Sequence, residues 1–198
     1  MSAFVSDPSL VWEWYNWRRQ LIREVAPNAG HYALGKLESL FDSFTLVTQN
    51  VDGLHRLAGS TNILELHGNI NRSRCVHCGT PAPEGIEIDP GNIACCEKCG
   101  GKYRPDVVWF GEMLNSDVIS AAFAASEAAE LFLSIGTSAV VHPAASLPVV
   151  AKRGGATLVE INPDRTPLSE LADFYFAAKS GEFLPGLIEE FEARRTDP

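Results

Sequence analysis

The residues of this sequence best suited to chemistry are its five cysteines, four of which form two pairs. The pairs are Cys75-Val-His-Cys78 and Cys96-Glu-Lys-Cys99, and 17 residues (79–95) separate them. This spacing is typical of a zinc site, in which two knuckles supply four thiolates to a tetrahedral shell. A shell closed by four thiolates has no place for a reactive water. We therefore predict one structural zinc ion.

The fifth cysteine and a nearby histidine leave two alternative ligand sets open. Cys95 could replace Cys96, but its spacing to Cys99 is one residue too long for a simple knuckle. His77 could also serve as a ligand, although an exposed or supporting position suits it better. Glycines follow both knuckles, where tight turns are needed.

Composition limits the classes of protein to which this zinc site could belong. The 198 residues suit one or two domains, and 45% hydrophobic with 21% charged residues is typical of a globular protein. A net charge of −9 disfavours nucleic acid as a partner, because such surfaces are basic. We expect no membrane partner and a cytoplasmic location, since the sequence contains neither an apolar run of about 20 residues nor a signal peptide.

Helical and strand patterns alternate along the chain. This alternation predicts an α/β fold with a parallel sheet, interrupted by a zinc module over residues 69–104. The segments 1–68 and 105–198 would then form one domain around the module. We predict helices over residues 9–24, 28–41 (capped by Asn28), 116–129, 143–154 and 182–195, and strands over 44–50, 62–68, 105–110, 131–138 and 157–162.

Small or polar residues follow four of the predicted strands. In chain order they are Gln49-Asn50-Val51-Asp52, His67-Gly68, Gly136-Thr137-Ser138 and Asn162-Pro163-Asp164. Each group alone could be a helix cap, a turn or a structural histidine. Ligands of parallel sheets bind at the carboxyl ends of the strands. The occurrence of all four groups at such strand ends therefore favours a nucleotide-like ligand.

Several long motifs resemble those of the sirtuins, which are NAD-dependent protein-lysine deacylases. They are TQNVDGLHRLAGSTNILELHGNI (48–70), the paired cysteine knuckles, RPDVVWFGE (104–112), GTSAVVHPAASLP (136–148) and INPDRTP (161–167). The resemblance extends from about Phe4 to the end of the sequence. It implies a Rossmann-like domain with an inserted zinc module, and NAD as cofactor.

The resemblance also implies roles for individual residues. His67 would be the general base, Asn50 and Asp52 would bracket the nicotinamide ribose, and Ser180 would lie near the adenine. The full set implied to bind NAD is Gln49, Asn50, Val51, Asp52, Gly136, Thr137, Ser138, Asn162, Pro163, Asp164 and Ser180.

The reaction implied by the family begins when the acyl carbonyl oxygen attacks the ribose and nicotinamide leaves. His67 then deprotonates a ribose hydroxyl, which attacks the imidate carbon, and the products are free lysine, nicotinamide and O-acyl-ADP-ribose. The partners would be acylated lysine side chains of proteins, with the substrate peptide bound as an added strand. The residues implied to clasp it are Val108, Phe110, Gly111 and Glu112, facing Val140 and Val141.

Tyr15 and Arg18 share one face of the first long helix, because they are three residues apart. Alone, the pair would be a core aromatic beside an exposed charge. In this family it resembles the acyl-pocket residues of members that prefer succinyl- or malonyl-lysine, where an arginine suits a carboxylate. Deacetylation is expected as an additional activity. We expect Trp12, Trp14 and Trp17 to pack rather than to bind ligand.

Two sirtuin features are absent from the sequence: the N-terminal Gly-Ala-Gly turn and the following cofactor loop. The resemblance therefore implies a Rossmann-like sheet without its N-terminal strand and without the usual pyrophosphate cradle. Two alternatives to a deacylase follow. One is a catalytically impaired peptide-binding module, and the other is an ADP-ribosyl transferase.

Overall fold

The computed structural model describes residues 1–196, and the chain divides into two compact units. Unit 1 comprises Met1–Ala26, Asn50–Gly53 and His67–Leu114. Unit 2 comprises Pro27–Gln49, Leu54–Leu66 and the described part of Asn115–Pro198; residues 197 and 198 of the predicted 105–198 segment lie outside the description. The predicted zinc module, residues 69–104, lies within unit 1 together with Met1–Ala26.

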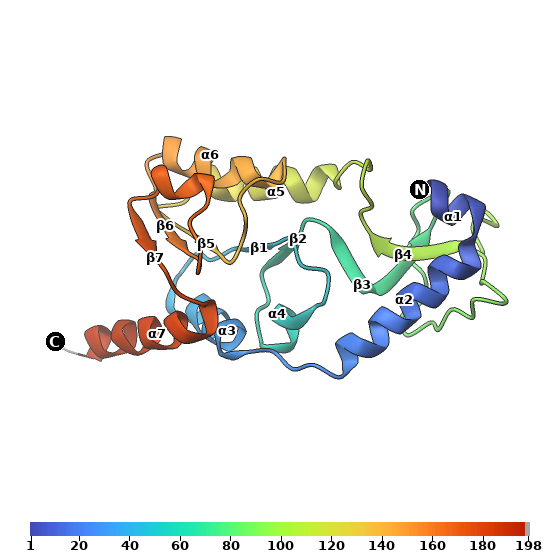
Figure 1. The fold of residues 1–198 in the computed structure, drawn as a ribbon, viewed down its shortest axis with the longest axis horizontal. Helices are drawn as coiled ribbons and strands as arrows, with labels where there is room; N and C mark the ends of the chain where they lie inside the picture. Colours follow the sequence, from blue (N-terminus) through green and yellow to red (C-terminus); the bar gives the residue numbers. More distant parts are fainter. Residues whose placement is uncertain (197–198) are drawn as a thin grey trace. The chain divides into compact units, whose positions relative to one another are not determined.

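Unit 2 is a layered α/β structure. Its main sheet is parallel, in the order β5 (Leu131–Ile135), β6 (Thr157–Ile161) and β7 (Phe174–Phe176). Helices α5 (Ser116–Glu127) and α6 (Leu147–Arg153) lie on one side, and α3 (Ala29–Leu40) and α7 (Ser180–Thr196) on the other (Figure 1). The remaining elements of unit 2 are the parallel pair β1 (Leu46–Thr48) and β2 (Ile63–Glu65), the short helix α4 (Leu54–Leu57), and the 3-10 turns η1 (Ala144–Ser146) and η2 (Pro167–Glu170).

The core of unit 2 follows from helical and strand periodicity. Ala33 and Leu37 are four residues apart on α3 and pack with Leu184 and Ile188, which are four apart on α7. Alternate residues of β5 and β6 meet these helices, because successive strand side chains point to opposite faces. Asn28 caps α3 as predicted: its side chain accepts from the N–H groups of Gly30 and His31.

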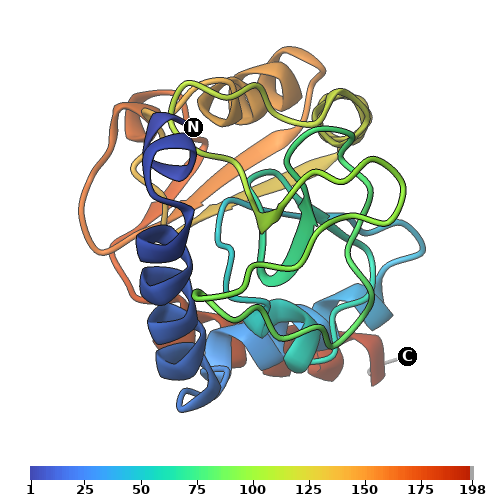
Figure 2. The same ribbon diagram turned by 90° about the vertical axis from the view of Figure 1, so that its right-hand side faces the viewer.

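Unit 1 consists of two helices and an antiparallel strand pair. Helix α1 (Ser2–Ser6) and helix α2 (Pro8–Arg23) follow one another in blue in Figure 2, separated by Asp7. Strand β3 (Gly68–Cys75) pairs with β4 (Tyr103–Val107), with a register shift between residues 69 and 73. Helix α2 packs against both strands.

The inward face of α2 carries Trp12, Tyr15 and Arg19, all buried. The indole N–H of Trp12 donates to Tyr103 O at 3.0 Å. The guanidinium of Arg19 donates to the carbonyls of residues 70 and 72, which lie in the irregular part of β3. Arg19 therefore satisfies backbone acceptors that the register shift leaves without a ladder partner.

The predicted packing of the tryptophans is confirmed for Trp12 and wrong for the other two. Trp12 is fully buried, whereas Trp14 and Trp17 are 50% and 53% exposed. The reason is geometric, because residues 12, 15 and 19 share one helix face and residues 14 and 17 point elsewhere.

The predicted α/β class is confirmed, and each predicted helix is present with ends shifted by a few residues. The predicted strand over 62–68 is present but shorter, because the chain changes partner at His67. Strand β2 ends at Glu65, and β3 begins at Gly68 with φ +77°. A Cβ at Gly68 would lie 2.1 Å from Asp106 O, so this turn requires glycine.

Two further expectations about the strands are corrected. The predicted strand over 105–110 ends at Val107, after which a turn forms in which Glu112 N–H donates to Trp109 O at 2.9 Å. The parallel strands form two sheets rather than one, since no ladder joins β1 to β5 within the described residues. None of the helices described has the length and apolar character needed to cross a membrane.

Candidate functional site

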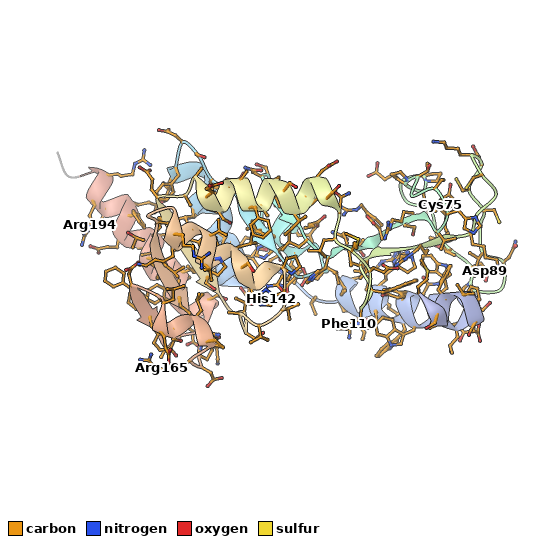
Figure 3. The ribbon with its side chains drawn as sticks, turned by 90° about the horizontal axis from the view of Figure 1, so that it is seen from above. Cys75, Asp89, Phe110, His142, Arg165 and Arg194 are labelled. Carbon is orange, nitrogen blue, oxygen red and sulfur yellow. The ribbon has the colours of Figure 1, made fainter. Side chains whose placement is uncertain are left out.

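The four paired cysteines meet at one point of unit 1. Their sulfur atoms all lie within 4.8 Å of one another, with Sγ–Sγ distances of 3.4 Å for Cys75–Cys99 and Cys78–Cys99 and 3.7 Å for Cys78–Cys96. Tetrahedral zinc with bonds of about 2.3 Å needs sulfur atoms about 3.8 Å apart. The donor set and its spacing therefore fit one zinc ion. Figure 3 labels Cys75, which ends β3.

The two knuckles have the same backbone construction. Gly79 N–H donates to Cys75 O at 3.1 Å, and Gly100 N–H donates to Cys96 O at 2.7 Å. Both glycines have positive φ, at +69° and +73°. Residues that carry a Cβ rarely adopt this backbone conformation. Cys95 is exposed and lies outside the cluster, so the residues brought together are the predicted Cys75, Cys78, Cys96 and Cys99.

Unit 1 also joins the Asn50–Gly53 loop to the segment that follows His67. Ile70 N–H donates to Val51 O at 2.8 Å, and the Asn71 side chain donates to Asp52 O at 3.2 Å. The carbonyl of His67 accepts from Val108 N–H at 3.0 Å. The backbone thus fixes the predicted base between the predicted ribose loop and the start of the predicted peptide-binding segment.

In unit 2, polar residues meet at the carboxyl ends of strands β1, β5 and β6, which belong to two sheets. Gln49, after β1, donates from Nε2 to Thr137 Oγ1 at 3.3 Å, and Thr137 follows β5. Asn162, after β6, donates from Nδ2 to Thr137 O at 3.0 Å. Gly136, Ser138 and Asp164 lie on the same loops and are exposed. Parallel sheets bind their ligands at this edge.

The loop after β6 is held by a buried carboxylate. Glu160 is 1% exposed and accepts hydrogen bonds from the hydroxyls of Thr166 and Ser169. On the other side of the loop, the Tyr175 hydroxyl donates to Pro163 O at 3.4 Å, and Arg165, labelled in Figure 3, stacks over the Tyr175 ring. Ser180 is the first residue of α7 and is partly buried.

Unit 1 contains a buried ion pair that the sequence patterns did not predict. Arg104 has 2% of its side chain exposed, and its Nη1 and Nη2 donate to the two oxygens of Glu112. The same carboxylate accepts from Trp109 N–H at 3.0 Å. Burial, the largest single influence, would raise the pKa of Glu112, but the hydrogen bonds from Arg104 and Trp109 N–H and the charges of Arg104 and Arg74 together outweigh it, so this pKa lies below its ordinary value. Glu112, predicted to bind substrate, therefore has its carboxylate engaged within its own segment.

The rest of that segment is open. Phe110, labelled in Figure 3, is fully exposed on the turn after β4, and Gly111 follows it with φ +84°. Val140 and Val141, which were predicted to face this segment, belong to unit 2 and are also exposed.

Tyr15 lies in the wall of a cavity of about 440 Å³ in unit 1. The hydroxyl of Tyr15 accepts from the indole N–H of Trp109 at 2.8 Å, and the Arg18 guanidinium lies 5.6 Å from the ring centre of Trp14. A cavity of this size suits a small ligand. The residues that line it are Met1, Ala3, Phe4, Leu10, Val11, Trp14, Tyr15 and Trp109.

Comparison with known proteins gives consistent matches. The Sir2 family model matches residues 1–143. An NAD-dependent protein deacylase of Aquifex aeolicus is 52% identical over 178 residues, covering 90% of this chain and 74% of the relative. A Sir2 homologue solved with NAD is 43% identical, with a TM-score of 0.89 over 98% of this chain and 75% of that chain.

A structure described as Sir2 with a p53 peptide and NAD+ is 32% identical, with a TM-score of 0.83 over 97% of this chain and 81% of that chain. The resemblance of the motifs, the strand-end cluster and these matches agree. The chain therefore belongs to the Sir2 family, the sirtuins.

Proposed function

We propose that this chain is an NAD-dependent protein-lysine deacylase. The observation that carries the proposal is the meeting of Gln49, Thr137 and Asn162 at the carboxyl ends of β1, β5 and β6, where a dinucleotide is expected to bind. The relatives named NAD-dependent protein deacylase support it. The proposed setting is the cytoplasm, where cysteines stay reduced and able to bind zinc.

Within this proposal, the strand-end loops of unit 2 hold the adenosine half of NAD. The residues assigned to it are Gly136, Thr137, Ser138, Asn162, Pro163, Asp164 and Ser180. Asn50, Val51 and Asp52 are assigned to the nicotinamide ribose, and Gln49, the preceding residue, belongs to the same proposed set. Bound NAD supplies an electrophilic ribose carbon with nicotinamide as its leaving group.

His67 accepts the proton of a ribose hydroxyl through a nitrogen of its imidazole ring, and its backbone is held by the hydrogen bond from Val108 N–H. The substrate backbone pairs with residues 108–111, whose turn Glu112 and Arg104 hold in place. The four clustered cysteines hold one zinc ion that stabilises the loops of unit 1.

The proposed acyl preference is for succinyl and malonyl groups, with acetyl as an additional substrate. Tyr15 supplies a hydroxyl in the cavity wall, and Arg18 supplies a positive charge beside Trp14, another wall residue. Both suit a carboxylate at the end of the acyl chain.

The test is an assay of the zinc-loaded full chain with NAD and peptides bearing succinyl-, malonyl- or acetyl-lysine. Nicotinamide release and free lysine are measured by mass spectrometry. We expect His67→Ala to lower the rate by at least about 100-fold, the usual contribution of a general base. The matched control is His77→Ala, an exposed histidine of the same unit, which should keep the wild-type rate.

Survival of activity in His67→Ala would contradict the assignment of the base. Peptide binding without NAD binding would identify a peptide-binding module instead. Transfer of a label from NAD to protein without acyl removal would identify an ADP-ribosyl transferase.

A further inference from the structure

We infer that Trp109 is a specificity-determining residue for the acyl group. By donating its indole N–H to the Tyr15 hydroxyl, Trp109 leaves the proton of that hydroxyl for the ligand, which favours acyl chains ending in a hydrogen-bond acceptor. This inference rests on the proposed deacylase function and assigns a residue that the motifs alone did not single out.

The direction of the hydrogen bond follows from the chemistry of the two groups. An indole N–H can only donate, so the oxygen of Tyr15 must be the acceptor across the 2.8 Å contact. A phenol has one proton, and this contact leaves that proton available. Tyr15 and Trp109 both line the cavity, so a ligand in the cavity can accept it.

Trp109 is held in this orientation by contacts on its ring and its backbone. The Arg104 guanidinium carbon lies 3.3 Å from its ring centre, and the Phe4 ring centre lies 5.6 Å away. Its backbone N–H donates to Glu112, which also binds Arg104. The buried ion pair therefore fixes the tryptophan, and the tryptophan fixes the tyrosine hydroxyl.

The surroundings of Tyr15 keep it a donor. Burial is the largest influence and raises the pKa of Tyr15, so the phenol stays protonated at neutral pH. The charged groups that act on it are Arg104, Arg18 and Glu112. Arg18 lies against Trp14 and so places a positive charge beside the cavity wall.

The remaining wall of the cavity is apolar. Met1, Ala3, Phe4, Leu10 and Val11 offer it no charged group. The best-matched acyl group therefore has a short aliphatic stem against these residues and a carboxylate at Tyr15 and Arg18. A succinyl group has this form, whereas butyryl has the same number of carbon atoms and an apolar end.

The test measures binding of two peptides that differ only in carrying succinyl- or butyryl-lysine. Dissociation constants are determined by calorimetry on the zinc-loaded full chain. In Trp109→Phe, which keeps an aromatic ring beside Arg104 but removes the N–H, we expect the succinyl-over-butyryl preference to fall about 5- to 10-fold. Butyryl binding should change less than about 2-fold. Trp17→Phe, an exposed tryptophan of α2, is the matched control and should leave the preference unchanged.

A double-mutant cycle separates this role from a general loss of packing. Tyr15→Phe should lower the preference by itself, and adding Trp109→Phe should lower it no further. An unchanged preference in Trp109→Phe would overturn the inference, as would equal weakening of both peptides or additive effects. In each of these cases the proposed function stands if the wild type still removes acyl groups. Binding of neither peptide, with no nicotinamide release, would overturn the proposed function and this inference together.

Discussion

The two units of this chain are stabilised in different ways. Unit 2 packs helices on both sides of a parallel sheet around an aliphatic core that includes Leu37, Ile161 and Leu184. Unit 1 has one antiparallel strand pair, with residues 76–102 running between its strands. Its core includes two of the clustered cysteines, Cys75 and Cys96. A small unit with few layers cannot bury enough apolar surface to stabilise its fold. Metal ligands and polar contacts between side chains therefore supply part of the stability.

The buried charges of the two units show the same contrast. In unit 1, Arg104 pairs with Glu112 and also donates to the carbonyl of Val107 at 2.9 Å. In unit 2, the buried Glu160 accepts from the hydroxyls of Thr166 and Ser169. Unit 1 therefore depends on an ion pair between side chains, and unit 2 uses neutral donors to hold a single loop.

The largest expected effect is that of removing zinc, which should destabilise unit 1 and leave the stability of unit 2 nearly unchanged. Chelation, or Cys75→Ser, should speed hydrogen exchange at the amides of β3 and β4 by about 1,000-fold or more, because binding of structural zinc contributes directly to folding. Exchange at β6 and α7 should stay within a few-fold of the starting rate. Hydrogen exchange measured by mass spectrometry resolves both regions.

Cys95→Ser is the matched control, since Cys95 is exposed and outside the cluster. It should bind zinc and exchange like the wild type. Equal exchange of β3 and β4 with and without zinc would show that unit 1 does not depend on the metal.

A smaller effect is expected from breaking the ion pair of unit 1. Glu112→Gln leaves the Arg104 charge buried without its partner and should lower the free energy of unfolding of unit 1 by about 2–4 kcal/mol. Urea denaturation followed by tryptophan fluorescence measures this. Arg104→Met on the same background should recover part of the loss, because the unpaired charge is removed.

Glu84→Gln, at an exposed position of unit 1, provides the comparison and should change stability by less than about 0.5 kcal/mol. If Glu112→Gln behaved in the same way, the ion pair would contribute little to unit 1.

The smallest effect is expected at the surface of unit 2. The ion pair with Lys152, and then the Leu158 N–H, hold the pKa of Asp173 below its ordinary value. A lowered pKa in the folded state means a stabilisation that is present above about pH 4 and lost as the pH falls through the lowered pKa. Asp173→Asn should therefore lower the Tm at pH 7, and the difference from the wild type should shrink towards pH 3.

Circular dichroism of both proteins across this pH range measures the difference. Asp42→Asn, at an exposed position of unit 2, should show no such trend. A difference that stays constant with pH would contradict the role given to the Asp173 carboxylate.

The sequence alone determined the features that depend on local spacing. The two knuckles meet because each C-x-x-C forms its own turn, and the glycines after them have the positive φ that these turns need. Asn28 caps α3 because the capping bonds join residues only two and three positions apart. The polar residues after β5 and β6 gather because neighbouring parallel strands place their carboxyl ends at one edge, as in the contact between Asn162 and Thr137.

Only the tertiary structure decided the features that depend on partners distant in the chain. The chain changes sheets at His67 because Gly68 packs against Asp106, 38 positions later. Trp12 is buried and Trp14 is not, because β4 lies on one face of α2. The contact between Trp109 and Tyr15 joins residues 94 positions apart. Trp109 lies in the turn after β4, where its backbone N–H donates to Glu112, the partner of Arg104. No local pattern encodes such a pairing, since its geometry exists only after the helix and the strands have packed.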